Sequence, residues 1–271
     1  MTVASDRSER FLALHNGDEP LLIPNPWDIG SARLLASLGF QALATTSSGF
    51  AGTLGRLDGN VTRDEAITHG AALAASVDVP VSADLENGFG HTPGEVADTV
   101  RLAGATGLAG CSIEDFSGRA DEPIYELSLA ADRVAAAVEV AHADGRALVL
   151  TARAENHLHR VGDLDDTIAR LQAYEAAGAD VLYAPGLHAL TDISAVVRSV
   201  TRPVNVLTWP GGPTVAELAA AGVRRISVGG ALSYVAMAAV GEAARELLDD
   251  GTLGFLERAK AGRSLAHVAF T

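Results

Sequence analysis

Apolar residues fall along this chain in short runs, and each run is followed by a longer segment whose apolar positions recur with helical spacing. The short runs are rich in Val, Leu, Ile and Ala, which predicts strands buried on both faces, as in a parallel sheet. The predicted strands cover residues 21–26, 40–44, 79–83, 108–113, 147–152, 180–183, 204–207 and 225–228. The predicted helices cover residues 5–15, 28–38, 62–77, 93–103, 127–142, 163–176, 190–200, 215–221, 232–248 and 255–260.

Local signals support several of these boundaries. Thr62 is followed three residues later by Glu65, a capping-box pattern that predicts the start of a helix. Two segments lack regular spacing and are predicted to be irregular: residues 45–58, which begin with a Thr/Ser/Gly run, and the polar loop 116–125. Several helices pass to the next strand through a glycine, namely Gly39, Gly107, Gly178 and Gly222.

Eight strands that alternate with helices through short connections predict an α/β protein with a parallel eight-stranded core. In this length the pattern favours a (β/α)8 barrel. An open doubly wound sheet is the alternative, but no G-x-G-x-x-G turn follows the first strand. We expect residues 1–271 to form one barrel domain, with a short N-terminal helix and additional C-terminal helices.

The composition restricts the classes of partner that the protein is expected to bind. The chain of 271 residues has 34 acidic and 20 basic residues, for a formal charge of −14, and no basic patch stands out, which argues against nucleic acid and anionic membranes. It has one cysteine, Cys111, and no long apolar segment of signal-peptide or membrane-spanning type. These features predict a cytoplasmic protein.

Candidate chemistry is concentrated where the third and fourth strands end. Asp84 and Glu86 are two residues apart, so in extended backbone both would point to one side, and a Gly88-Phe89-Gly90 turn follows. The next strand also ends in acids, Glu114 and Asp115. Carboxylates at strand ends suit Mg2+, although acids in such places also serve as helix caps or simply face solvent.

Other strand ends supply candidate substrate contacts. Arg153 has a planar guanidinium that can hold a substrate carboxylate, or else form a structural ion pair with Glu155 or Glu114. Ser47 and Ser48 belong to a polar run that can present hydroxyls and backbone N–H groups to an oxyanion, or that is an ordinary polar loop. Strand-end residues also assigned to the substrate pocket are Trp27, Tyr183 and Asn205.

From about Phe11 to Ala238 the chain resembles the isocitrate lyase and phosphoenolpyruvate mutase superfamily, and specifically its phosphonomutase-like subgroup. The resemblance rests on Asp58, Asp84-Leu85-Glu86-Asn87-Gly88-Phe89-Gly90, Ser112-Ile113-Glu114-Asp115, Thr151-Ala152-Arg153 and Gly178-Ala179-Asp180-Val181-Leu182-Tyr183.

The resemblance implies a (β/α)8 barrel that assembles as a homotetramer and often exchanges its last barrel helix between subunits. It implies Mg2+, with Mn2+ as a substitute, held directly by Asp84 and through water by Asp58, Glu86 and Glu114. It also implies that Arg153 holds a carboxylate and that the loop with Ser47 and Ser48 meets the substrate. The implied substrate is a small dicarboxylate or α-keto acid, cleaved through an enolpyruvate-like state.

The chain departs from better-known members of that superfamily. Its loop 116–125 has neither the cysteine of isocitrate-type lyases nor the lysine of the mutases, and Pro185 replaces a glutamate of methylisocitrate-type lyases. The general acid or base is therefore not identified.

We expect a Mg2+-dependent lyase that cleaves a C–C bond of an oxaloacetate-like or 2-methylisocitrate-like acid. Decarboxylation best tolerates the missing cysteine, because CO2 leaves without a proton donor. The alternatives are a mutase or hydrolase acting on the P–C bond of phosphonopyruvate-like substrates, and an α-keto acid binding protein with little turnover.

Overall fold

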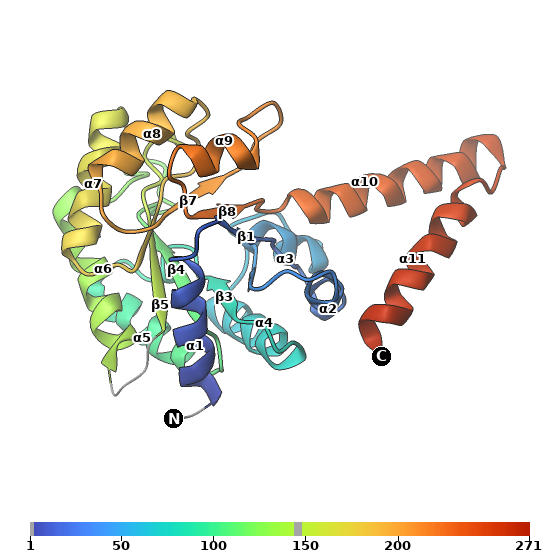
Figure 1. The fold of residues 1–271 in the computed structure, drawn as a ribbon, viewed down its shortest axis with the longest axis horizontal. Helices are drawn as coiled ribbons and strands as arrows, with labels where there is room; N and C mark the ends of the chain where they lie inside the picture. Colours follow the sequence, from blue (N-terminus) through green and yellow to red (C-terminus); the bar gives the residue numbers. More distant parts are fainter. Residues whose placement is uncertain (1–2, 144–147) are drawn as a thin grey trace.

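The computed structural model describes residues 3–143 and 148–271, so the predicted start of the fifth strand at Ala147 lies outside the described residues. Eight parallel strands form its centre (Figure 1): β1 (Leu21–Ile23), β2 (Leu43–Ala44), β3 (Val81–Asp84), β4 (Gly110–Glu114), β5 (Val149–Arg153), β6 (Val181–Tyr183), β7 (Val204–Leu207) and β8 (Arg225–Ser227). Each strand from β2 to β7 pairs with the next strand in the sequence, and β8 also pairs with β1. A hydrogen bond from Ala44 N of β2 to the carbonyl oxygen of Pro24, the residue after β1, is 3.1 Å long and nearly closes the ring. The predicted (β/α)8 barrel is confirmed.

Helices alternate with the strands, and most of them begin where the sequence predicts. They are α1 (Val3–Leu14), α2 (Ile29–Ser37), α3 (Ser47–Thr53), α4 (Arg63–Ser76), α5 (Pro93–Gly104), α6 (Leu127–Ala141), α7 (Leu164–Ala176), α8 (Leu190–Ser199), α9 (Val215–Ala220), α10 (Ala231–Arg245) and α11 (Phe255–Phe270). Thr62 caps α4 through the predicted capping box with Glu65. The main apolar core lies between the outer faces of the strands and these helices.

A smaller apolar cluster closes the N-terminal end of the barrel. Phe11 of α1 is fully buried there against Leu21, Ile23 and Val149. Gly110 allows this close approach, because a Cβ at that position would lie 2.8 Å from Cε1 of Phe11 and 2.7 Å from the carbonyl oxygen of Val149. The opposite, carboxyl end of the barrel is left open for polar side chains.

Two helical segments differ from the sequence prediction. Residues 45–58 were predicted to be irregular, but Ser47–Thr53 form α3, since Thr46 caps the helix by accepting a hydrogen bond from Gly49 N. The last helix was predicted to end at Lys260, but α11 continues to Phe270, whose ring contacts α2 near Gly30. In both segments the cap or the tertiary contacts stabilise a helix, although the sequence contains weak helix formers such as glycine.

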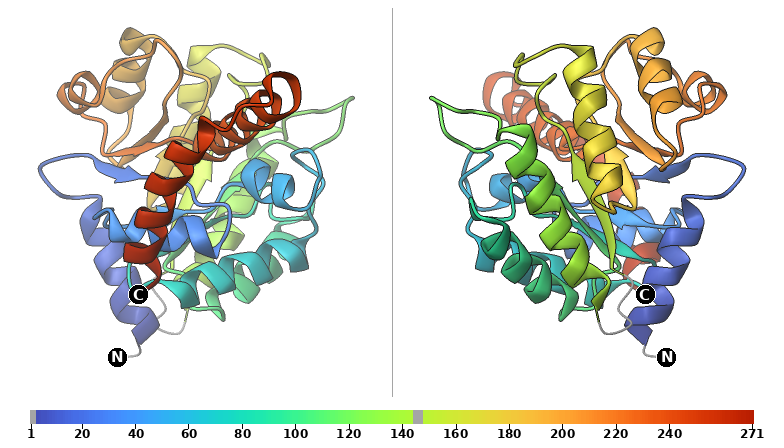
Figure 2. Two further views of the ribbon diagram at one scale, coloured as in Figure 1. Left: turned by 90° about the vertical axis from the view of Figure 1, so that its right-hand side faces the viewer. Right: turned by 90° about the vertical axis from the view of Figure 1, so that its left-hand side faces the viewer.

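The two C-terminal helices stand apart from the barrel (Figures 1 and 2). Helix α10 leads away from β8, a π-helical turn at Glu246–Asp250 interrupts the helix predicted over 232–248, and α11 returns toward α2. No residue of α10 or α11 is buried. Within the described residues, every helix is too short or too polar to cross a membrane.

Candidate active site

A cavity of about 450 Å3 opens at the carboxyl ends of the strands, the end at which (β/α)8 enzymes place their chemistry. Most of the residues that the sequence assigned to substrate or metal line it. They are Ser47, Ser48, Asp58, Asp84, Arg153, Tyr183 and Asn205. Trp27, Glu86 and Glu114 are the assigned residues that do not line this cavity.

Arg153 is the centre of the charge arrangement. Its Nη1 lies 3.0 Å from Asp84 Oδ1, and its Nη2 lies 3.1 Å from Glu114 Oε2 and 2.7 Å from Glu155 Oε1. The side chain is only 15% exposed, and its guanidinium also lies over the Tyr183 ring at 5.0 Å. One cation therefore joins three carboxylates while still facing the cavity.

Asp84 is held in place from several directions. Its backbone N–H donates to Thr45 Oγ1 at 2.8 Å, and its Oδ2 accepts from the backbone N–H of Ser47 at 3.3 Å. Its Oδ1 accepts from Glu86 N at 3.3 Å as well as from Arg153. The backbone and the carboxylate of Asp84 are therefore fixed by contacts from the residue after β2, from α3 and from β5.

The backbone turns sharply after Asp84. Glu86, Gly88 and Phe89 have φ values of 49°, 76° and 54°, in the left-handed region that non-glycine residues rarely adopt. Glu86 is therefore not in the extended backbone on which the sequence prediction relied. Its side chain lies beside the cavity, among Phe50, His69 and residues of the loop before α3.

A buried arginine forms hydrogen bonds to the backbone of this turn. Arg133 of α6 donates through Nη1 to Gly90 O at 2.7 Å and through Nη2 to Asn87 O. Its guanidinium lies 4.0 Å from the centre of the Tyr125 ring, and Tyr125 OH in turn pairs with His91 Nδ1 at 2.6 Å. The turn that follows Asp84 is therefore held in place by contacts with the side chain of Arg133.

Asp115, the second acid at the end of β4, has a positioning role. Its Oδ1 accepts from Glu155 N at 2.7 Å, and its Oδ2 accepts from Tyr174 OH and from Arg170 Nη1. These contacts fix the backbone at Glu155 and through it the carboxylate that pairs with Arg153. Asp115 is 3% exposed and lies outside the cavity.

Acidic groups outnumber basic ones in this region. Burial, followed by the charges of Asp84 and Asp58, raises the pKa of Glu86 to about 7. Burial also raises the pKa of Glu114 well above its ordinary value, although Arg153 opposes that shift. Around Arg153, at the open end of the cavity, carboxyl groups therefore outnumber cations.

The donor set fits Mg2+ rather than a metal held by many side chains. In the described part of the chain, no three His, Cys, Asp or Glu side chains converge closely enough to hold a metal ion among themselves. Mg2+ usually takes one or two carboxylates and keeps several waters. Asp84 and the exposed Asp58 both line the cavity, which is a number of carboxylates compatible with such an ion.

The loop 116–125 does not reach the cavity. An isolated bridge between Phe116 and Ile124 and a hydrogen bond from Ser117 N to Pro123 O shape it into a hairpin whose tip protrudes from the barrel (Figure 2). Its one cation, Arg119, pairs with Asp121 at 3.3 Å and Glu122 at 3.0 Å. The loop thus supplies no acid or base to the cavity in this structure.

Sequence reasoning missed several residues that line the cavity. They are Ser82, Ser112, Trp209, Arg225, Ser227 and Tyr234. The serines and Arg225 point into the barrel from strands that the sequence suggested were apolar throughout. Their signal was the period of two within each strand, since inward and outward positions alternate.

The chain is similar to several known proteins. The family model described as Phosphoenolpyruvate phosphomutase matches residues 11–248. A solved structure from Burkholderia cenocepacia J2315, provisionally described as a lyase/mutase, is 52% identical, covers 98% of this chain and 96% of its own, and has a TM-score of 0.94.

Two enzymes are more distant relatives. The oxaloacetate decarboxylase of Bradyrhizobium sp. (strain BTAi1 / ATCC BAA-1182) is 30% identical over 73% of this chain and 69% of its own. The 2-methylisocitrate lyase of Escherichia coli (strain K12) is 30% identical over 72% of this chain and 67% of its own.

Proposed function

Because the chain belongs to the isocitrate lyase and phosphoenolpyruvate mutase superfamily, we propose that it is a Mg2+-dependent lyase that cleaves a C–C bond of a small α-keto or α-hydroxy carboxylate. One observation carries the proposal. The guanidinium of Arg153 faces a polar cavity at the carboxyl end of the barrel, beside the carboxylate of Asp84. A cation next to a metal-binding carboxylate is the arrangement needed to bind and orient an anionic substrate.

The residues of the chain divide the work. Asp84 would hold Mg2+ directly, with Asp58, Glu86 and Glu114 acting through water. When bound, Mg2+ would supply Lewis-acid stabilisation of negative charge on the substrate oxygen. Arg153 would hold the substrate carboxylate and orient the scissile bond, and the hydroxyls of Ser47 and Ser48 would contact the same end of the substrate. Tyr183 and Asn205 would line the rest of the pocket.

Among the candidate substrates, an oxaloacetate-like acid fits best, ahead of a 2-methylisocitrate-like one. In its decarboxylation the bond to the departing carboxylate breaks, CO2 leaves, and the electron pair forms the enolate of pyruvate, which then takes a proton from water. No proton donor is needed for the leaving group. This matters because the loop 116–125, which lacks the usual cysteine and lysine, lies away from the cavity.

Cleavage of a P–C bond is less well supported. The loop 116–125 lacks the lysine of the mutases, and its one cation, Arg119, is paired with two carboxylates and lies outside the cavity. We therefore treat phosphonopyruvate as a competing substrate in the test rather than as a second proposal.

The deciding experiment is an assay of pyruvate release, coupled to lactate dehydrogenase, with oxaloacetate, 2-methylisocitrate and phosphonopyruvate. Each compound is tested with Mg2+ and with EDTA, beside a protein-free control that contains Mg2+. We expect a metal-dependent rate on oxaloacetate well above that control. No rate on any of the three would contradict the lyase proposal and favour a binding protein with little turnover.

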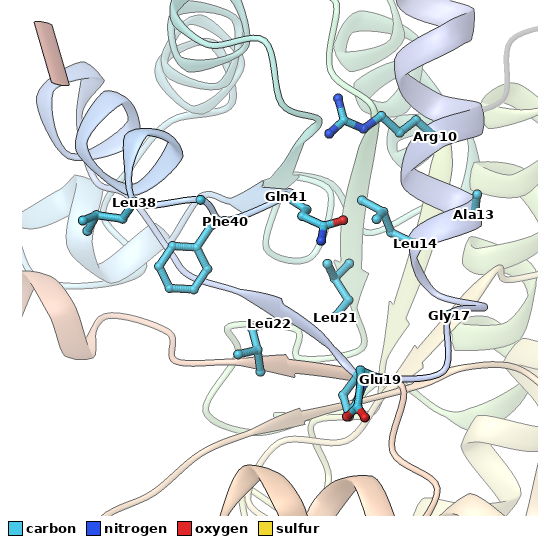
Figure 3. Close-up of a pocket in the computed structure, with 12 residues that line it drawn as sticks. Arg10, Ala13, Leu14, Gly17, Glu19, Leu21, Leu22, Leu38, Phe40 and Gln41 are labelled. Carbon is cyan, nitrogen blue, oxygen red and sulfur yellow. The ribbon is translucent and has the colours of Figure 1, made fainter. Parts of the chain in front are cut away.

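The protein would act as a homotetramer in which subunits exchange α10. A largely apolar cavity of about 620 Å3, which Arg10, Glu19 and Gln41 also line, lies on the barrel between α1 and the end of α2 (Figure 3), beside Leu22 of β1, which is 40% exposed. Helix α10 leads away from the barrel and exposes Val235, Met237 and Val240. A second copy of α10 is the occupant whose apolar surface would fit this cavity.

A further inference from the structure

The floor of the active-site cavity contains a buried cation without a counter-ion. Arg225, the first residue of β8, is 4% exposed and lines the cavity. Its Nη1 donates to Thr151 Oγ1 at 3.0 Å, whereas its Nε is buried without a hydrogen-bond partner. Among the described residues, no carboxylate lies within ion-pair distance of this guanidinium.

Among the described residues, two of the other buried arginines pair with carboxylates and Arg133 does not, but Arg225 is the one whose guanidinium has a buried nitrogen without a hydrogen-bond partner. Arg153 pairs with three carboxylates, Arg170 pairs with Asp115 and Asp166, and Arg133 donates to two backbone carbonyls. Burial lowers the pKa of Arg225 only to about 10, so the group stays charged at neutral pH. An unpaired buried charge is strongly unfavourable, so a ligand that pairs with it would be bound with a large gain.

The surroundings of Arg225 are polar and incompletely satisfied. Asn205, its partner in the β7–β8 register, is 1% exposed and donates through Nδ2 to Ser227 Oγ at 3.0 Å, but its Oδ1 has no donor. Ser82 and Ser112 line the same cavity. Barrel interiors are usually filled by branched apolar side chains, so small polar ones leave room for a polar ligand.

The spacing along β5 gives the distance between the floor of the cavity and the level of Arg153. Thr151, which accepts from Arg225, is two residues before Arg153 on the same strand, so the two levels are separated by roughly 6.6 Å. A four-carbon dicarboxylate has a similar length. One carboxylate at Arg153 would therefore place the other near Arg225.

We propose that the cavity floor is a second anion subsite, in which Arg225 holds a carboxylate-sized anion and Asn205 Oδ1 accepts from a water or hydroxyl beside it. The anion is either the far carboxylate of a dicarboxylate substrate or a free monocarboxylate. The first of these rests on the proposed function, because it assumes that the substrate is held at Arg153. Arg225 is then the residue that selects dicarboxylates over monocarboxylates.

The test compares the binding of succinate with that of its monoamide, succinamate, by calorimetry in the presence of Mg2+. We expect the wild-type chain to bind succinate roughly tenfold or more tightly than succinamate, because a charge-assisted contact is lost with the second carboxylate. Arg225→Gln should abolish this preference and Arg225→Lys should keep part of it. The matched control is Arg224→Gln, since Arg224 is exposed and donates only to the backbone of Gly17 and Asp18.

A second measurement separates the two sources of the anion. Acetate is titrated without Mg2+ while thermal unfolding is followed. If acetate raises the Tm of the wild type but not of Arg225→Gln, and succinate has no preference over succinamate, a free anion occupies the floor. Equal binding of succinate and succinamate by the wild type, with no effect of acetate, would overturn the subsite, and this comparison needs no folded variant. Both measurements follow binding and not turnover. A lack of lyase activity would therefore count against the proposed function, but it would not prevent these binding results from being interpreted.

Discussion

Arg153 at the end of β5 and Asp84 at the end of β3 are joined by an ion pair of 3.0 Å between Nη1 and Oδ1. Glu114, which ends the strand between them, pairs with the same guanidinium. One cation therefore links the ends of three consecutive strands at the point where the cavity opens. We expect the removal of this cation to lower the stability of the protein, and the removal of the Asp84 charge to weaken metal-dependent binding.

Replacing Arg153 with methionine should destabilise the protein. The substitution leaves the carboxylates of Asp84, Glu114 and Glu155 close together without a cation, and removal of one partner from a buried ion pair typically costs about 3–5 kcal/mol. Urea denaturation would measure the loss. The control is Arg258→Met, which breaks an exposed pair with Glu242 and should change the free energy of unfolding by less than about 1 kcal/mol. Equal effects of the two variants would show that the cluster is not stabilising.

Replacing Asp84 with asparagine should abolish metal-dependent ligand binding. The amide keeps the shape of the side chain but loses the charge that Mg2+ requires, so we expect kcat/KM to fall by roughly 100-fold or more. Oxalate binding by calorimetry, with Mg2+ and with EDTA, gives a readout without turnover. Asp78→Asn, an exposed carboxylate shortly before the same strand, is the control. Unchanged Mg2+-dependent oxalate affinity in Asp84→Asn would remove this residue from the metal site.

Much of the site could be predicted because parallel strands bring their carboxyl ends to one edge. Asp84, Arg153 and Tyr183 are far apart in the sequence, yet each lies at or directly after the end of a predicted strand, and all three line the cavity. The positions of Ser47 and Ser48 followed from the same rule, although the helix that they begin did not. Thr46 caps that helix, but its glycines and threonine are weak helix formers.

Other features depend on contacts that a single sequence does not reveal. The left-handed backbone at Glu86 is stabilised by tertiary contacts around the following turn, including those of Arg133, a residue that looks like an ordinary helix cation. Arg225 begins a predicted strand, where a charged residue normally meets solvent. It is buried because Phe11 and the rest of α1 close that end of the barrel.

Replacing Arg119 with alanine should leave oxaloacetate turnover within about twofold of the wild type. Arg119 is exposed at the tip of the protruding loop, pairs with Asp121 and Glu122, and lies outside the cavity, and surface ion pairs contribute little. Steady-state kinetics with oxaloacetate and phosphonopyruvate would check this. A loss of tenfold or more would mean that the loop closes over the substrate and brings Arg119 with it.

Replacing Val240 with glutamate should weaken the proposed tetramer. Val240 is 69% exposed on α10, and a charge there would have to be buried against the apolar cavity of another subunit. Light scattering after size exclusion should give about four times the chain mass for the wild type and a smaller assembly for the variant. Leu102→Glu, at an exposed apolar position on α5, is the control. An unchanged mass in Val240→Glu would contradict exchange through α10.

The histidine that directly follows α1 should make the stability of the fold sensitive to acid. His15 is 1% exposed, its Nδ1 pairs with Phe11 O at 2.8 Å, and burial, followed by the charge of Arg225, lowers its pKa to about 3. Between pH 6.5 and 3 the unfolded chain therefore binds a proton at this residue that the folded chain does not. The stability that neutral His15 contributes is complete above about pH 6.5 and is lost as the pH falls toward 3, by about 2 kcal/mol at pH 5. Urea denaturation between pH 5 and 7.5 should show a steeper pH dependence for the wild type than for His15→Gln, whereas His267→Gln, at an exposed position on α11, should match the wild type. The same slope in all three proteins would mean that folding does not lower the pKa of His15.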